Sequence, residues 1–313
     1  MVSPDDVFSM STPWQTTMID RLSSTACAPG GWSYRTGSPA AAEPTALVCL
    51  AMIRHGMTPD HWQHGLTMLA RIQEKSGGVP STPSADSPYW PTGLAVAAWN
   101  AHDADSGHDY EHPIDRAVQW LVNTRGCAIP NRPDIYGHNS QLQGWSWVEG
   151  THSWLEPTAY GVLGLRAVGQ DHHPRTREAV VLLRDRMFPS GGWNYGNTRT
   201  FGRTLRPFPG TTGIVLTALA GARDIASIKP SVHYLNGELQ HVRSPMSLAW
   251  GVIGLTECGV RPREADTWLS ESALRALGRD ASPLEDALLL LADPKSPPFG
   301  CDAAQPRESQ VNG

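Results

Sequence analysis

The chain has 313 residues, of which 40% are hydrophobic and 18% are charged. This composition is typical of a globular protein with a large core and excludes intrinsic disorder over most of the chain. The formal net charge of −5 lacks the basic excess that non-specific nucleic-acid binding requires, so we expect no nucleic-acid partner.

The N-terminal segment, residues 1–13, contains Asp5 and Asp6 and has no apolar core of a signal peptide. We therefore expect a cytoplasmic protein. No apolar stretch reaches the ~18 residues that span a bilayer, so we expect no transmembrane segment and leave peripheral membrane contact open. The five cysteines include no CxxC pair, which favours free thiols.

A repeat begins at residue 30 and organises the rest of the chain. Glycine-rich turns that end in Trp or Val recur along it, followed by Pro-Thr pairs at the same interval of 12 residues (32 to 44, 79 to 91 and 145 to 157). Proline suits the first turn of a helix, so each pair predicts a helix start. The turns are Gly30-Gly31-Trp32, Gly77-Gly78-Val79, Gly144-Trp145 and Gly191-Gly192-Trp193.

Six helices of one class are expected, and they alternate with a second class. The predicted starts lie near Pro44, Pro91, Pro157, Thr211, Pro245 and Pro283. Helices such as 45–53 and 158–167 are apolar on all sides, which is typical of helices buried on both faces. Segments such as 60–73 and 115–123 are amphipathic and belong outside them. The alternation predicts an all-α protein, an α/α toroid of about six hairpins over residues 14–292, with the inner helix N-termini on one rim; an open solenoid is the alternative.

Two polar stretches, 102–112 and 126–143, are expected to form loops over one rim. The first holds a dense set of metal-type side chains, but their spacing matches no zinc or calcium site, so we expect neither a metal nor another cofactor. These side chains are His102, Asp103, Asp105, His108, Asp109 and His112. Residues 293–313 are rich in proline and lack periodicity, which predicts a disordered tail.

Two features of these repeats resemble known families. The helix ending in Gln73 before Gly77-Gly78, together with Gly191-Gly192-Trp193, resembles the QW repeats of squalene–hopene and oxidosqualene cyclases. The Pro44-Thr45 type of helix start resembles those of the cyclases and of protein prenyltransferase β subunits. The resemblance covers roughly residues 14–292 and implies a toroid that cyclises or rearranges an isoprenoid, an isomerase-type reaction.

The resemblance also implies a catalytic acid. In the cyclases an Asp-x-Asp-Asp-Thr-Ala motif opens one inner helix, and its middle Asp donates a proton. Aligned on Thr158-Ala159, Glu156 takes the middle position, and the equivalent repeat places Glu43 there. Glu156 is therefore the expected proton donor and Glu43 the second choice; alternatively, each glutamate only complements its helix dipole. The Asp-x-Cys of a prenyltransferase zinc site is absent from the helix starts.

A toroid gathers the residues at its inner helix starts around a central cavity. Aromatic side chains there could hold an isoprenoid and stabilise a carbocation, whereas Trp32 and Trp193 in the repeat turns are expected to be structural clamps. The expected cavity residues are Trp90, Trp147, Trp154, Tyr160, Gly210 and Ser244.

A further expectation concerns the loop before Gly210. Arg203 and Arg206 beside a helix N-terminus predict a diphosphate site, or else an ordinary solvated loop. The expected ligand is a hydrophobic isoprenoid or another lipid-like molecule. The alternatives are a non-catalytic toroid that binds a lipid or protein partner, and a prenyltransferase-like protein without the zinc site.

Overall fold

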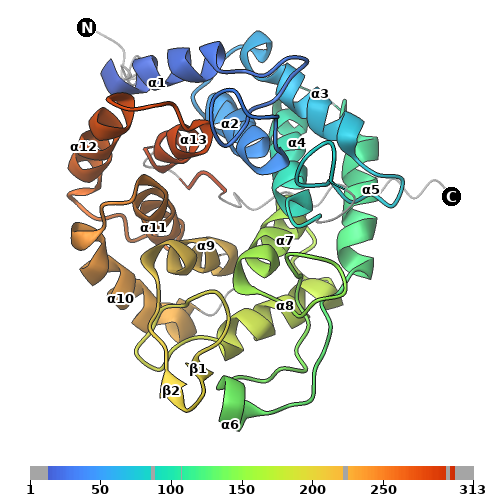
Figure 1. Cartoon of the computed structure of the whole chain (residues 1–313), viewed down its shortest axis with the longest axis vertical. Coiled ribbons are helices and arrows are strands. Elements are labelled where there is room, and N and C mark those ends of the chain that lie inside the picture. The colour runs from blue at the N-terminus through green and yellow to red at the C-terminus, as the bar shows by residue number, and fades with distance from the viewer. Residues whose placement is uncertain (1–12, 86–88, 107, 221–224, 294–296, 300–313) are drawn as a thin grey trace, which may run out of the picture.

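The computed structural model of the chain describes residues 13–85, 89–106, 108–220, 225–293 and 297–299, so most of the N-terminal segment lies outside the described residues. Within them, six helices form an inner ring and six outer helices surround it (Figure 1). The inner helices are α2 (Ala42–Arg54), α4 (Thr92–Ser106), α7 (Leu155–Ala167), α9 (Pro209–Leu219), α11 (Pro245–Glu257) and α13 (Pro283–Ala292). The outer helices are α1 (Pro13–Ser24), α3 (Gln63–Ile72), α5 (Glu111–Asn123), α8 (Pro174–Asp185), α10 (Lys229–Glu238) and α12 (Ala265–Leu277).

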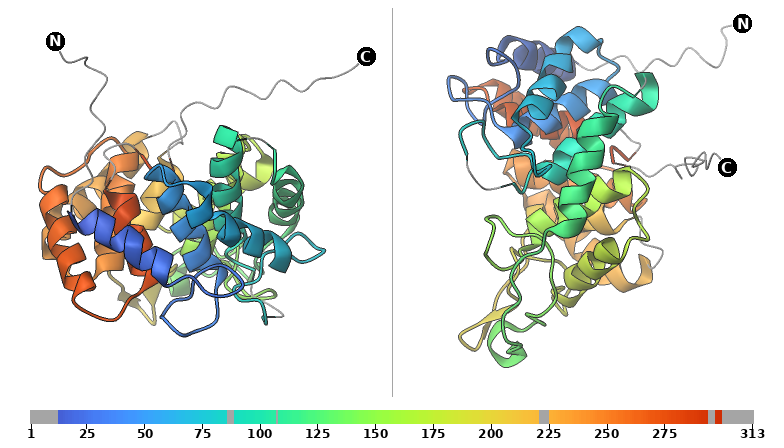
Figure 2. Two further views of the ribbon diagram at one scale, coloured as in Figure 1. Left: turned by 90° about the horizontal axis from the view of Figure 1, so that it is seen from above. Right: turned by 90° about the vertical axis from the view of Figure 1, so that its right-hand side faces the viewer.

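The short elements lie in the connections. They comprise α6 (Pro133–Tyr136), the antiparallel hairpin of β1 (Arg199–Thr200) and β2 (Arg203–Thr204), and the 3-10 turns η1 (Pro59–His61), η2 (Ile225–Ile228) and η3 (Leu239–His241). The views in Figure 2 show the hairpin and α6 projecting from the edge of the molecule. None of the described helices combines the length and apolarity that crossing a membrane requires.

The predicted fold class is confirmed, and each inner helix begins within two residues of its predicted start. Consecutive inner helices pack against each other, and α13 packs against α2, so the inner ring is closed. The prediction of a loop over 102–112 is wrong at both ends, because α4 continues to Ser106 and α5 begins at Glu111. The other predicted loop, 126–143, contains the short helix α6.

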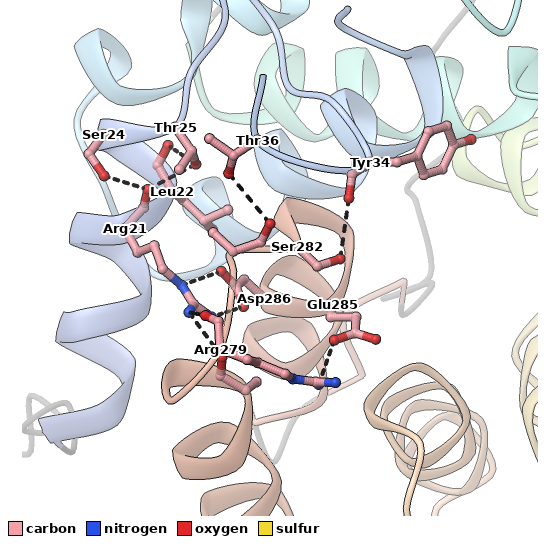
Figure 3. Close-up of polar contacts among 12 residues, drawn as sticks. Arg21, Leu22, Ser24, Thr25, Tyr34, Thr36, Arg279, Ser282, Glu285 and Asp286 are labelled. Atoms are coloured by element: carbon pink, nitrogen blue, oxygen red, sulfur yellow. Dashed lines mark hydrogen bonds and ion pairs between the residues drawn. The ribbon is translucent and has the colours of Figure 1, made fainter. Parts of the chain in front are cut away.

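Ring closure joins the first described helix to the last one and excludes the open solenoid. The Arg21 guanidinium of α1 holds the buried Asp286 carboxylate of α13 with two bonds, Nε–Oδ2 at 2.8 Å and Nη2–Oδ1 at 2.5 Å (Figure 3). Arg21 also donates to the carbonyl of Ala276 at 3.0 Å, near the end of α12. Ser282 Oγ donates to the carbonyl of Tyr34 at 3.4 Å in the same region.

Hydrogen bonds join each Trp of a repeat turn to the start of the next inner helix. Trp32 donates its backbone N–H to Thr45 Oγ1 at 2.9 Å, and its ring N–H to the carbonyl of Leu22 at 2.7 Å in α1. Each Trp of a repeat turn thus ties an inner helix start to the preceding outer helix. The equivalent bonds link Trp145 to Thr158 and Leu121, and Trp193 to Thr212 and Leu183.

Glycines allow two pairs of inner helices to approach closely. A Cβ on Gly93 of α4 would lie 2.0 Å from the carbonyl oxygen of Tyr160 in α7. A Cβ on Gly213 of α9 would lie 2.2 Å from the carbonyl oxygen of Trp250 in α11. Side chains cannot fit at either position, so these contacts fix the spacing around the ring.

Candidate active site at the inner rim

Glu43 lies in the first turn of α2 and is only 9% exposed. Its carboxylate accepts a hydrogen bond from Tyr34 Oη at 2.8 Å and a second one from the hydroxyl of Tyr160 in α7. Burial raises the pKa of Glu43 to about 7, and the nearby charge of Glu156 adds to the rise against the opposing effect of the two tyrosine hydrogen bonds. Glu43 is therefore a carboxyl group that can hold a proton near neutral pH.

Glu156 lies at the equivalent position in the first turn of α7 and is half-buried. Its Oε1 accepts a hydrogen bond from Thr211 Oγ1 at 2.7 Å, in the first turn of α9. Burial raises the pKa of Glu156 too, while this hydrogen bond lowers it. The charges of both glutamates act on the buried Tyr160, so α2, α7 and α9 bring their N-terminal ends to one place.

Aromatic rings extend from this pair of carboxyl groups. The Trp90 ring lies 4.9 Å from Trp147 and 5.8 Å from Tyr160, measured between ring centroids. The Tyr160 ring lies 6.0 Å from that of Trp250 in α11. We call Trp90, Trp147, Tyr160 and Trp250 the aromatic row. Tyr160 and Trp250 are buried, whereas Trp90 and Trp147 are half-buried and can offer their faces to an apolar or cationic group.

The other predicted cavity residues make contacts of their own. Trp154 packs on His152 with a centroid distance of 4.6 Å. Gly210 lies beside Ser247 of α11. Ser244 is exposed, and its hydroxyl caps α11 by accepting the N–H of Ser247 at 3.5 Å.

The two arginines predicted to bind diphosphate are both exposed. Arg203 pairs with Thr200 in the hairpin that projects from the edge of the ring (Figure 1). Arg206 lies within electrostatic reach of Tyr234 on the outer helix α10. The geometry therefore brings these arginines toward the periphery rather than to the carboxyl pair.

Two of the side chains in the dense His and Asp cluster, His102 and Asp103, stabilise the connection between α4 and α5. His102 Nε2 lies 3.2 Å from Asp109 Oδ2, and the Asp103 carboxylate accepts the backbone N–H of Tyr110 at 3.3 Å.

Two surface grooves, of about 400 and 500 Å³, lie beside the outer helix α3. Both are lined by Pro29, Met68 and Arg71. Neither groove is lined by a residue of the carboxyl pair or the aromatic row.

Two partners of the site were missed in the sequence, although the repeats carry a signal for them. Tyr34 follows Trp32 by the same two residues as Trp147 follows Trp145. Trp250-Gly251-Val252 in α11 occupies the same place as Tyr160-Gly161-Val162 in α7. Aligning the inner helices on these glycines predicts an aromatic position that faces the centre of the ring.

Comparisons with known proteins establish the fold. No family model matches the chain. The fold is an all-α, α/α toroid. A wild-type glycosidase matches over 89% of this chain and 95% of its own, with 12% identity and a TM-score of 0.59. The GH76A α-1,6-mannanase from Salegentibacter sp. HEL1_6 matches over 89% and 97%, with 10% identity and a TM-score of 0.59. A protein from Actinoplanes matches over 89% and 98%, with 14% identity and a TM-score of 0.58.

In sequence, the chain is similar to a probable squalene–hopene cyclase from Sinorhizobium fredii (strain NBRC 101917 / NGR234). The two are 28% identical over 131 residues, which is 42% of this chain and 19% of the cyclase. The match thus spans about a fifth of that relative.

Proposed function

We propose that the inner rim is an acid–base active site that protonates an isoprenoid-type substrate held against the aromatic row. The observation that carries the proposal is the burial of Glu43 between two tyrosine hydroxyls, beside Glu156 and the aromatic row. A carboxylic acid must keep its proton at working pH to act as a donor, and burial next to a second acidic group favours that state.

The proposed reaction begins with transfer of the Glu43 proton to a substrate double bond. Glu43 then carries a negative charge, which the hydroxyls of Tyr34 and Tyr160 stabilise by hydrogen bonding. The substrate becomes a carbocation, which the half-buried rings of Trp90 and Trp147 stabilise by cation–π attraction. Loss of a proton from this cation to the Glu156 carboxylate leaves a neutral isomer of the substrate.

This assignment gives the donor role to Glu43 rather than to Glu156, the first choice from sequence. Glu43 is the more buried of the two and accepts hydrogen bonds from two tyrosines, whereas Glu156 is half-buried and accepts one from Thr211. The sequence similarity to a probable squalene–hopene cyclase supports an isoprenoid substrate.

A second candidate is cleavage of a glycosidic bond. A carboxyl group that keeps its proton and a second carboxylate on the same rim are also the two groups that glycoside hydrolysis uses. The folds of a glycosidase and of an α-1,6-mannanase are similar to this one. The aromatic surroundings of the deeply buried Glu43 favour the apolar substrate.

The test is to incubate the purified protein separately with squalene, prenyl diphosphates and α-1,6-mannan, and to analyse the products by mass spectrometry. The wild type and the control Glu149→Gln, at an exposed position, should convert an isoprenoid. Glu43→Gln and Glu156→Gln should remain folded and lose at least about a hundredfold in turnover. Release of mannose oligomers would support the second candidate instead, and binding of an isoprenoid without turnover would support a non-catalytic toroid.

A further inference from the structure

Residues 297–299, which follow α13 in the chain, lie inside the ring. Residues 293–313 were expected to be a disordered tail, and most of them lie outside the described residues; among those described, Pro298 is buried and Phe299 packs inside the molecule. Figure 1 shows a short red segment lying within the inner ring. The Phe299 ring stacks on Trp250 with a centroid distance of 5.9 Å and an interplanar angle of 17°.

A second contact holds this segment at the far end of α11. The backbone N–H of Phe299 donates to Glu257 Oε1 at 2.7 Å, and Glu257 is the last residue of α11. Glu257 also lies within electrostatic reach of Arg166 and Arg54, at the C-terminal ends of α7 and α2. The segment therefore lies at the C-terminal rim, opposite the rim that carries Glu43.

The two rims are connected through the aromatic row. Trp250 lies seven residues before Glu257, which in a helix is two turns and roughly 10 Å along the axis. The Trp250 ring lies next to the ring of Tyr160, whose hydroxyl donates a hydrogen bond to the Glu43 carboxylate. Phe299 contacts the same indole ring, so it occupies the place where the row would continue toward the C-terminal rim.

We propose that Phe299 is an intramolecular occupant of an apolar subsite on Trp250, which an apolar ligand chain must displace in order to lie along the aromatic row. The proposal rests on the proposed function for the chemical class of the ligand. Phe299 is half-buried and belongs to none of the described helices, so its displacement separates no pair of packed inner helices. A ligand that binds only the open state has its affinity reduced by the fraction of molecules that are closed.

The test is binding of farnesol, a 15-carbon isoprenoid alcohol, followed by quenching of tryptophan fluorescence. We compare the full chain with Phe299→Ala and with a chain that ends at Asp293. Both changes should tighten farnesol binding about tenfold, because the subsite is then always open. The matched control is Phe201→Ala, since Phe201 is 93% exposed and its loss should leave the affinity unchanged. A synthetic peptide of residues 294–313, added to the shortened chain, should weaken farnesol binding again.

Unchanged affinity in Phe299→Ala and in the shortened chain, or no farnesol binding to any of these proteins, would overturn the proposal. Circular dichroism melting identifies a shortened chain that fails to fold, in which case Phe299→Ala alone decides. The double variant Glu43→Gln/Phe299→Ala separates this proposal from the proposed function, since it should lack turnover and still bind farnesol about tenfold more tightly than Glu43→Gln alone. Tighter binding by Phe299→Ala in a protein that turns over no isoprenoid would support the subsite and reject the acid mechanism.

Discussion

At the scale of single residues, the raised pKa of Glu43 predicts how stability depends on pH. The folded protein binds a proton at Glu43 that the unfolded chain releases between about pH 4.5 and 7. Since the folded state binds more protons there, the free energy of unfolding falls as the pH rises through this window. Glu43→Gln should remove up to about 3 kcal/mol of this fall, measured by urea unfolding at both ends of the window. Parallel pH profiles for the wild type and Glu43→Gln would show that Glu43 titrates normally in the folded protein.

The sequence predicted the carboxyl groups of the site better than the surrounding residues. Glu43 and Glu156 stand at helix starts, where the repeat itself fixes their place on the rim. The direction of a side chain in a connection depends on tertiary structure, so the contact of Trp154 with His152 could not be predicted. The direction of the hairpin that carries Arg203 could not be predicted for the same reason.

At the scale of helices, replacing a glycine with alanine should have opposite effects on stability at a close helix contact and at an exposed helix position. Gly213→Ala places a Cβ against the Trp250 carbonyl, so it should lower the free energy of unfolding by about 1–3 kcal/mol or more. Gly237 lies in the outer helix α10, where an added Cβ would meet no atom within 4 Å. Gly237→Ala should therefore stabilise the protein by about 0.5–1 kcal/mol through helix propensity. Urea unfolding of both variants measures the contrast, and an equal effect at the two positions would contradict the close contact between α9 and α11.

The Pro-Thr helix starts were predictable because local chemistry determines them. Proline fits the first turn, and the threonine hydroxyl accepts the N–H of the preceding turn residue, as Thr158 does for Trp145 at 3.1 Å. The continuation of α4 to Ser106 was missed, because polar residues such as His102 and Asp103 are buried there against Asp109 and Tyr110. The sequence pattern of this segment is typical of a loop, but its tertiary contacts stabilise a helix.

At the scale of the whole molecule, the buried ion pair of Arg21 and Asp286 joins α1 to α13, where the ring closes. The sequence predicted the toroid and left an open solenoid as the alternative, because this contact joins residues far apart in the chain. Asp286→Ala leaves the Arg21 guanidinium without its buried partner and should cost about 3–5 kcal/mol of stability. The control Arg279→Ala removes the more exposed ion pair with Glu285 and should cost at most about 1 kcal/mol. Thermal unfolding measures both, and equal losses would show that the buried pair does not govern closure.

Incorporation of deuterium into the product tests whether Glu43 donates a proton to an isoprenoid. In heavy water the Glu43 carboxyl exchanges its proton for deuterium, which protonation of a double bond then transfers to a carbon atom of the substrate. Mass spectrometry of the product formed from squalene or a prenyl diphosphate should show carbon-bound deuterium with the wild type and with Glu149→Gln. Folded Glu43→Gln should yield no such product. Product without deuterium, or labelled product formed by Glu43→Gln, would contradict the assignment of Glu43 as the proton donor.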